Sequence, residues 1–139
     1  MDELRYEPFD TLVLDKLYEV YRTNYEFGNG EVDVTIDVEM VKELDFLIDF
    51  LKEYEGWFEN MIKTNDFKEL VNKKNGYWLE LGDEKVTLDV MIAATKLKRI
   101  EFMLFPYITL IYDNELFYGH DVVVEVDCLN FSSFSIDIK

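Results

Sequence analysis

The stretch D-N-E-L-F-Y-G-H-D-V-V-V-E-V-D at residues 113–127 decides how the C-terminal part of the chain folds. It opens with a turn signal, because Asp and Asn both tolerate the positive φ of tight hairpin turns. Apolar residues precede this turn at 107–112 and follow it at 116–118, so the sequence predicts a β-hairpin. Gly119 interrupts the second predicted strand, which indicates either a β-bulge or a close approach of the backbone to another group.

The same stretch ends with a strand pattern. Val122, Val124 and Val126 recur with a period of two, which places them on one face of a strand. Glu125 and Asp127 occupy alternate positions. The sequence therefore predicts a strand with one buried face and one acidic face.

A second stretch, at residues 31–38, has the same alternation. Val and Ile alternate there with acidic residues that include Asp33 and Asp37, which predicts another half-buried strand. A Gly-Asn-Gly turn signal at 28–30 precedes it, and an apolar run at 18–27 precedes the turn. The two runs therefore predict a second hairpin.

The hydrophobic period changes after this strand. Apolar residues over 41–62 are spaced by three, four and seven positions, which predicts an amphipathic helix with Gly56 as a kink near its middle. Shorter helices over 66–74 and 88–95 each follow a Thr that favours an N-cap. Trp57 lies off the main apolar stripe, so it is either a further core contact or an exposed anchor for a partner.

The order of these elements predicts the fold class. Strands come first, helices follow, and further strands over 97–105, 107–112 and 133–138 complete the chain. We expect an α+β fold, with a mostly antiparallel sheet and two or three helices packed on one face. A length of 139 residues without a linker predicts a single domain over residues 1–139.

The charge balance is strongly acidic. The formal net charge is -16, from 30 acidic and 14 basic side chains, and residues 1–62 hold 17 of the acids with only 5 bases. Direct binding to nucleic acid or to an anionic membrane requires Lys and Arg that face phosphate, so we expect neither. The excess indicates either a solvated surface or a face that meets a basic protein.

The compartment follows from what the sequence lacks. The sequence contains no run of about twenty apolar residues, the length needed to span a membrane. Residues 1–10 are charged and lack the apolar core of a secretory signal. Cys128 is the single cysteine, so no internal disulfide forms, and we expect a small buried hydrophobe there. These features predict a cytoplasmic protein that is a monomer or a weak dimer.

Reaction chemistry is sparse in this sequence. The chain has one His and one Cys and lacks the common nucleotide-binding, zinc-binding and nucleophile motifs. His120 has no second His with which to hold a metal. We therefore expect a hydrogen bond from its ring to a backbone group or a carboxylate that fixes the bulge. The sequence predicts no enzymatic activity, no metal and no cofactor.

Two segments carry a resemblance to a known family. The run L-F-Y-G-H-D-V-V-V at 116–124 resembles the C-terminal signature L-F-W-G-H-x-I of short bacterial proteins classed as a domain of unknown function. The run N-G-Y-W at 75–78 is similar to the N-x-W-W of that family, and 87–97 to its short helix before a sheet. Tyr118 replaces the usual Trp. The family has no established activity and implies no catalytic residues; its members are similar in size and charge to immunity proteins of bacterial toxin systems.

These observations lead to three functional hypotheses. The first is an immunity-type inhibitor whose partner is a basic toxin domain. The second is an acidic mimic of nucleic acid from a phage or mobile element, and the third is a domain that binds a small ligand. Under the first hypothesis the residues expected to meet Lys and Arg of the partner are Asp121, Glu125 and Asp127, or else Asp33 and Asp37 on the other acidic strand. An aromatic residue such as Trp57 or Tyr118 is expected to anchor the centre of the interface.

Overall fold

The computed structural model describes residues 2–28 and 30–139, and its strands form one eight-stranded sheet. The strands are β1 (Glu3–Arg5), β2 (Thr11–Asp15), β3 (Val20–Phe27), β4 (Gly30–Asp37), β5 (Lys96–Leu104), β6 (Tyr107–Asp113), β7 (Val122–Asp127) and β8 (Asn130–Ile138). The α-helices are α1 (Leu44–Met61), α2 (Asn65–Tyr77) and α3 (Leu88–Ala94), and the 3₁₀ helices are η1 (Val38–Glu43) and η2 (Glu115–Phe117).

The sheet is antiparallel except at its centre. The strands lie in sequence order from β1 to β8, and only β4 and β5 are parallel neighbours. A parallel pair needs a crossover of a dozen or more residues, because its strands run in the same direction. Here the crossover contains all three α-helices, so the helices divide the sheet into two antiparallel halves.

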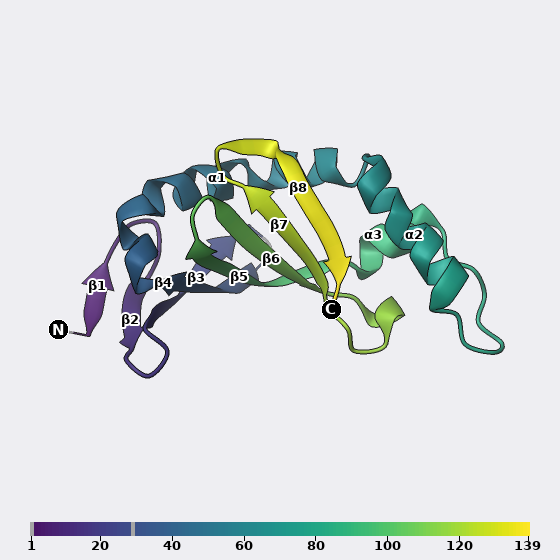
Figure 1. The fold of residues 1–139 in the computed structure, drawn as a ribbon, viewed down its shortest axis with the longest axis horizontal. Helices are drawn as coiled ribbons and strands as arrows, with labels where there is room; N and C mark the ends of the chain where they lie inside the picture. The colour runs from purple at the N-terminus through teal and green to yellow at the C-terminus, as the bar shows by residue number, and fades with distance from the viewer. Residues whose placement is uncertain (1, 29) are drawn as a thin grey trace.

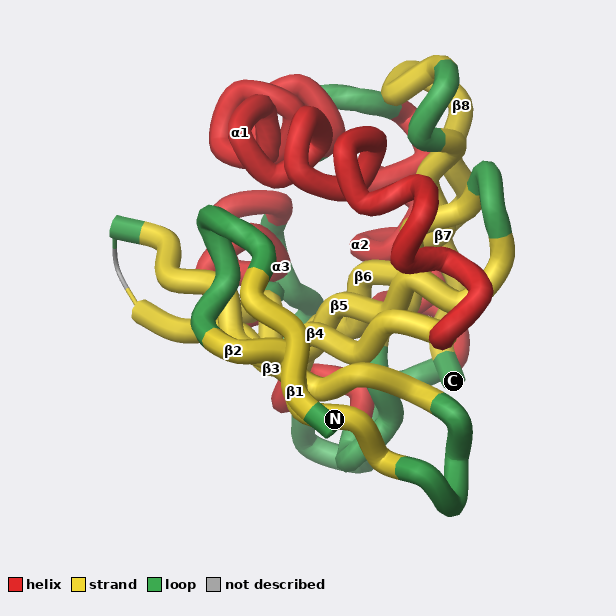
Figure 2. The backbone as a smooth tube through the Cα atoms, turned by 90° about the vertical axis from the view of Figure 1, so that its left-hand side faces the viewer, coloured by secondary structure: helices red, strands yellow, loops and turns green. Residues whose placement is uncertain are grey.

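Helix α1 lies across the concave side of the curved sheet (Figures 1 and 2). It contacts both halves: Tyr54 packs on Phe27 of β3 at 5.0 Å between ring centroids, and Phe50 on Phe131 of β8 at 5.1 Å. Trp57 is 8% exposed, and its Nε1 donates a hydrogen bond of 2.8 Å to the Phe131 carbonyl. Trp57 is thus part of the core and not an exposed anchor.

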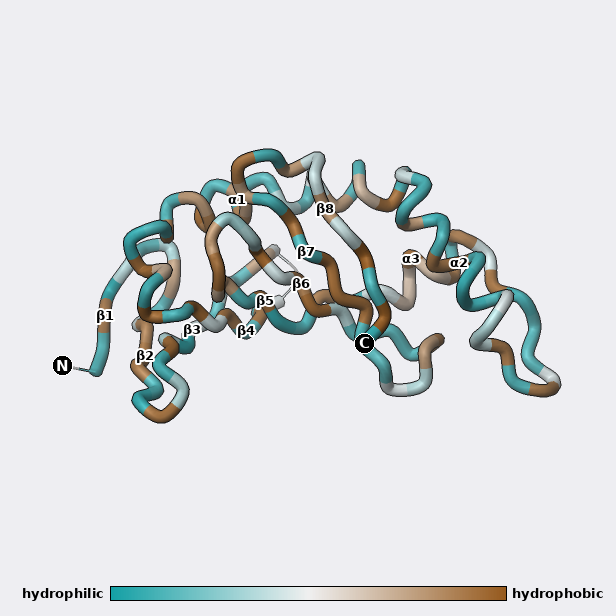
Figure 3. Tube along the Cα trace, viewed as in Figure 1, coloured by the Kyte–Doolittle hydropathy of each residue, from teal (hydrophilic) through white to brown (hydrophobic). Residues whose placement is uncertain are grey.

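The prediction that the helices pack together on one face of the sheet is wrong. Only α1 crosses the sheet, whereas α2 and α3 lie beyond its end, close to η2 (Figure 1). The physical reason lies in the sequence of α2, which is mainly hydrophilic (Figure 3) and buries only Phe67, Leu70 and Lys74. Such a narrow stripe covers the end of a core, whereas the wide apolar surface of α1 covers a sheet.

The predicted hairpin around residues 113–118 is also wrong. The Asn114 side chain accepts a hydrogen bond from the Leu116 N–H at 3.0 Å and caps η2, so 116–118 is not a strand. Tyr118 and Gly119 then adopt left-handed backbone conformations, with φ of 51° and 87°. These residues redirect the chain into β7, which is the antiparallel partner of β6. Gly119 lies in this loop and does not form a bulge.

Other local predictions are confirmed. The hydroxyl oxygens of Thr64 and Thr87 accept hydrogen bonds from backbone N–H groups at 3.2 and 3.3 Å and cap α2 and α3. Strands β3 and β4 form the predicted hairpin; Asn29 of its turn lies outside the described residues. Helix α1 is continuous through Gly56, so this residue does not split the helix, and the kink there stays a prediction.

Candidate partner-binding surface

The side of the sheet that faces away from α1 carries many acidic side chains. In β4 and β7 the alternate residues are buried Val or Ile that face α1, so the residues between them point to the opposite side. We call this side the acidic face. Its acidic residues include Asp15, Glu26, Glu31, Asp33, Asp37, Glu101, Asp113, Glu125, Asp127 and Asp137.

The sheet register brings the two predicted acidic strands onto this one face. Thr35 of β4 lies beside Glu101 of β5, which is opposite Thr109 of β6, which is opposite Glu125 of β7. Neighbouring strands are about 4.8 Å apart, so Glu101 and Glu125 are separated by about 10 Å. The sequence suggested β4 and β7 as alternative binding surfaces, and the structure places both on the same face of one sheet, with β5 and β6 between them.

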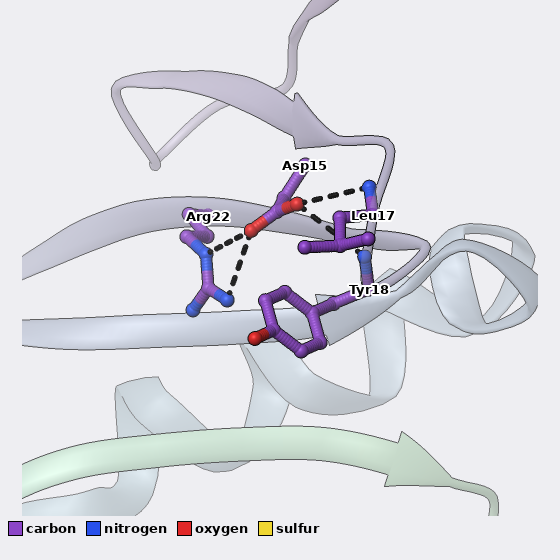
Figure 4. A network of polar contacts seen from close by, with 4 residues as sticks. All are labelled: Asp15, Leu17, Tyr18 and Arg22. Carbon is purple, nitrogen blue, oxygen red and sulfur yellow. Dashed lines mark hydrogen bonds and ion pairs between the residues drawn. The ribbon is translucent and has the colours of Figure 1, made fainter.

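Two bases on the acidic face are paired within the protein. Arg22 places Nη2 3.1 Å from Oδ2 of Asp15, and the other Asp15 oxygen accepts the N–H groups of Leu17 and Tyr18 (Figure 4). Arg99 Nε lies 3.5 Å from Glu101 Oε2, an ion pair without hydrogen-bond geometry. The acidic side chains of this face outnumber its basic side chains, so its net charge is negative.

The face also contains an arrangement that costs stability. Glu26 of β3 lies directly opposite Glu31 of β4, and both side chains are exposed. Like charges in directly opposed positions of an antiparallel pair are destabilising. The face is therefore not organised for maximum stability of the sheet.

The acidic residues predicted to bind a partner differ in whether they already have a partner within the protein. Asp33 and Glu125 are exposed, and no ion pair among the described residues includes either of them. Asp37 accepts the Glu39 N–H and caps η1, and Asp127 accepts the Leu129 N–H in the turn after β7, each at 2.8 Å. Glu125 is thus the strongest candidate for contact with a partner, followed by Asp33, which lies beside Arg99 on the same face.

Asp121 has a structural role instead. Its Oδ1 lies 2.8 Å from Nζ of Lys98, which is also 3.2 Å from Asp113. The hydrogen bonds to Asp121 and Asp113 raise the pKa of Lys98. This network ties β5 to the ends of β6 and β7, so Asp121 is already occupied by an internal partner.

Tyr118 belongs to a separate polar cluster. Its hydroxyl donates to Asp83 at 2.6 Å and accepts from Nζ of Lys74 at 2.9 Å. Lys74 is 3% exposed and also donates to the Trp78 carbonyl. The hydrogen bonds from Tyr118 and from the Glu80 N–H lower the pKa of Asp83. Tyr118 therefore joins α2, the loop after it and the loop before β7.

The two segments that resemble the bacterial family meet at this cluster. Trp78 packs edge-on against Phe117 and His120, with ring centroids 5.5 and 4.9 Å apart. His120 is exposed, and its ring makes no hydrogen bond to any described residue, so the hydrogen bond predicted for it is wrong. Its ring packs on Trp78 instead.

An exposed apolar group, which sequence analysis missed, lies at one end of the acidic face. We call it the apolar turn cluster; it contains Met103, Leu104, Tyr107 and Leu129, which are 39–66% exposed. Tyr107 is directly opposite Asp127, and the Cys128 N–H donates to the Pro106 carbonyl at 2.8 Å, which joins the two turns. Adjacent exposed apolar groups with a polar rim are typical of interaction sites.

Two further observations concern the described part of the chain. Within residues 2–28 and 30–139, no group of three or more His, Cys, Asp or Glu side chains is placed to hold a metal ion. No helix in these two ranges is long and apolar enough to cross a membrane.

Comparison with known proteins identifies the family. Residues 7–133 match the family described as "Uncharacterized protein conserved in bacteria (DUF2262)", and the chain belongs to it. This match confirms the bacterial domain of unknown function predicted from the sequence. No curated protein and no solved structure matches the chain.

Proposed function

We propose that this protein is a non-enzymatic, cytoplasmic inhibitor of the immunity type. It binds a basic toxin domain and blocks the active or substrate-binding surface of that domain. The observation that carries the proposal is the union of two acidic strands on one face of the sheet. Asp33 of β4 and Glu125 of β7 are exposed there without an internal ion pair.

The shape and chemistry of the surface support this proposal. Tight interfaces have a central apolar anchor and a polar rim, and charge pairs at the rim speed association and set specificity. The apolar turn cluster supplies exposed anchors such as Tyr107 beside Asp127. The acidic face supplies the charges that would meet Lys and Arg of the partner.

The size of the acidic face indicates how much of the surrounding surface the interface must include. Strands β4 to β8 at about 4.8 Å spacing, with six residues of about 3.3 Å each, give a footprint of about 20 Å by 20 Å. A standard interface buries about 800 Å² on each partner. The acidic face alone is smaller than that, so we expect the apolar turn cluster to be part of the interface.

Affinity capture from the bacterial host tests the proposal. The baits are the wild-type protein, the acidic-face variant Asp33→Lys/Glu125→Lys and a control variant Asp49→Lys/Glu53→Lys. Asp49 and Glu53 lie on the exposed side of α1, so the control makes the same change in net charge elsewhere. We expect the wild type and the control to retain the same basic protein and the acidic-face variant to lose it.

A second step separates inhibition from simple binding. The retained protein is expressed in the host with and without the wild-type inhibitor, and cell growth is measured. Growth arrest that only the wild type and the control variant relieve supports the proposal. Equal capture by all three baits, or a retained protein that does not affect growth, contradicts it. Release of several nucleic-acid-binding proteins by duplex DNA would instead support a mimic of nucleic acid.

A further inference from the structure

A half-open cavity lies between the β3–β4 hairpin, α1 and the start of β5. Its volume is about 580 Å³, which is within the usual range for small-molecule sites. Phe27, Val32, Phe58 and Leu97 supply its apolar lining. Aromatic and aliphatic side chains from three separate elements therefore converge on one space large enough for a small organic molecule.

Two buried tyrosines are among the residues that line this cavity. Tyr54 and Tyr112 are 9% and 0% exposed, both line the cavity, and their oxygens are 2.7 Å apart. A phenol carries one hydrogen, so a single hydrogen bond uses only one of the two hydroxyl hydrogens. The hydrogen bonds of the described residues include no other acceptor for either group. The pair therefore retains one hydrogen. Because Tyr112 is fully buried, this hydrogen can reach an acceptor in the cavity only from Tyr54, with Tyr112 as the donor to the Tyr54 oxygen.

The two hydroxyls also stay protonated near neutral pH. Burial raises the pKa of Tyr54 and Tyr112 well above the ordinary value for a phenol. The inner end of the cavity is thus a neutral hydrogen-bond donor, and an oxygen or nitrogen acceptor is the complementary group.

The lining from α1 is acidic. Glu55 and Glu59 line the cavity one helical turn apart, both side chains are exposed, and no ion pair among the described residues includes them. Like charges at this spacing destabilise a helix, so a cation between them is favourable. Glu31 of β4 and Lys96 at the start of β5 also line the cavity, so its four charged lining residues carry a net negative charge.

We propose that this cavity binds a small aromatic amine that carries a hydroxyl or carbonyl oxygen at the end opposite its ammonium group. The oxygen accepts the free hydrogen of the Tyr54–Tyr112 pair. The ring packs against Phe27 and Phe58, and the ammonium group lies near Glu55 and Glu59. Glu31 of the acidic face lies at the edge of the cavity, but none of the three proposed contacts uses it, so this inference does not rest on the proposed function.

Titration of the full chain with three probes tests the proposal. Tyramine has both required groups, phenethylamine lacks the oxygen, and 4-hydroxyphenylacetate replaces the ammonium group by a carboxylate. We expect saturable binding of tyramine, with amide chemical-shift changes at residues 54–59 and 95–97. Phenethylamine should bind about fivefold more weakly, the ratio for one hydrogen bond, and the anion should not bind.

Matched variants assign each contact. Glu55→Gln/Glu59→Gln should weaken tyramine binding about tenfold, whereas the control Asp49→Asn/Glu53→Gln should leave it unchanged. Tyr54→Phe/Tyr112→Phe should remove the preference for tyramine over phenethylamine. Replacing both hydrogen-bond partners by groups of similar shape is nearly neutral for folding, and circular dichroism verifies this.

Three results would overturn the proposal. The first is the absence of saturable binding of tyramine at millimolar concentration to the folded wild type. The second is equal binding of the amine and the anion. The third is a set of chemical-shift changes that lies away from the cavity.

Discussion

The opposed glutamates of the β3–β4 hairpin give a prediction that separates stability from binding. Glu26→Lys replaces the like-charged pair with Glu31 by an opposite-charged pair on the same face of the sheet. Cross-strand pairs contribute about 0.2–1 kcal/mol, and here a repulsion is removed and an attraction is added. We therefore expect the free energy of unfolding to rise by about 0.5–1.5 kcal/mol.

The control removes the effect of net charge. The protein has a formal net charge of -16, and any Glu→Lys change relieves general repulsion. Glu84→Lys makes the same change in the exposed loop before α3, where no described residue forms a hydrogen bond or ion pair with the Glu84 side chain. The difference between the free energies of unfolding of the Glu26→Lys and Glu84→Lys proteins therefore gives the contribution of the cross-strand pair alone.

Urea unfolding followed by circular dichroism measures this difference. With a slope of about 2 kcal/mol per molar urea, the expected gain shifts the midpoint by about 0.3–0.7 M. The advantage over Glu84→Lys should shrink at 1 M NaCl, where the Debye length is about 3 Å. A Glu26→Lys protein no more stable than Glu84→Lys, or an advantage independent of salt, would refute the reasoning.

Three further predictions concern the core, the acid response and the thiol. Phe50→Ala should lower the free energy of unfolding by about 3–5 kcal/mol, because Phe50 is fully buried against Trp57 and Phe131. Calorimetry measures this loss, and the control Phe46→Ala should lose less, because Phe46 is only half-buried. The hydrogen bond from Tyr118 lowers the pKa of Asp83 below 3.8, so Asp83→Asn should reduce the loss of stability as the pH falls from 4 toward that lowered pKa, measured by urea midpoints. Burial, followed by the charge of Asp127, raises the pKa of Cys128 to about 11, so a disulfide reagent at pH 7 should react much faster with unfolded than with folded protein.

Local sequence patterns predicted the elements that depend on near neighbours. The alternation around Asp33 and around Glu125 identified β4 and β7, because a half-buried strand repeats every two residues. The presence of Thr64 and Thr87 was sufficient to predict the N-caps of α2 and α3, since an N-cap involves only the next few residues. These features require no knowledge of distant contacts.

The remaining features depend on contacts that are distant in sequence. The position of α2 and α3 follows from the parallel pairing of β4 with β5, which are separated by all three helices. The Asp-Asn dipeptide at 113–114 was ambiguous, because Asn114 caps a 3₁₀ helix as readily as it forms a hairpin turn. The first error arose from a long-range strand pairing, and the second from a local signal that fits two structures.

The candidate surface was predictable only in part. The sequence identified Asp33 and Glu125, but the sheet order was needed to place them on one face. The exposure of Leu104 and Tyr107 depends on the irregular register between β5 and β6 near the turn. Trp57 was ambiguous because the sheet curves around α1 and buries residues outside its main apolar stripe.

The association rate with the captured basic partner, measured against ionic strength, tests the central claim most directly. Rim charges act mainly on this rate, and salt screens them. We predict that Asp33→Lys/Glu125→Lys slows association at least about tenfold at low salt and flattens its salt dependence, whereas Asp49→Lys/Glu53→Lys has a much smaller effect. Equal rates and equal salt dependence for the two variants would contradict the assignment of the acidic face as the binding surface.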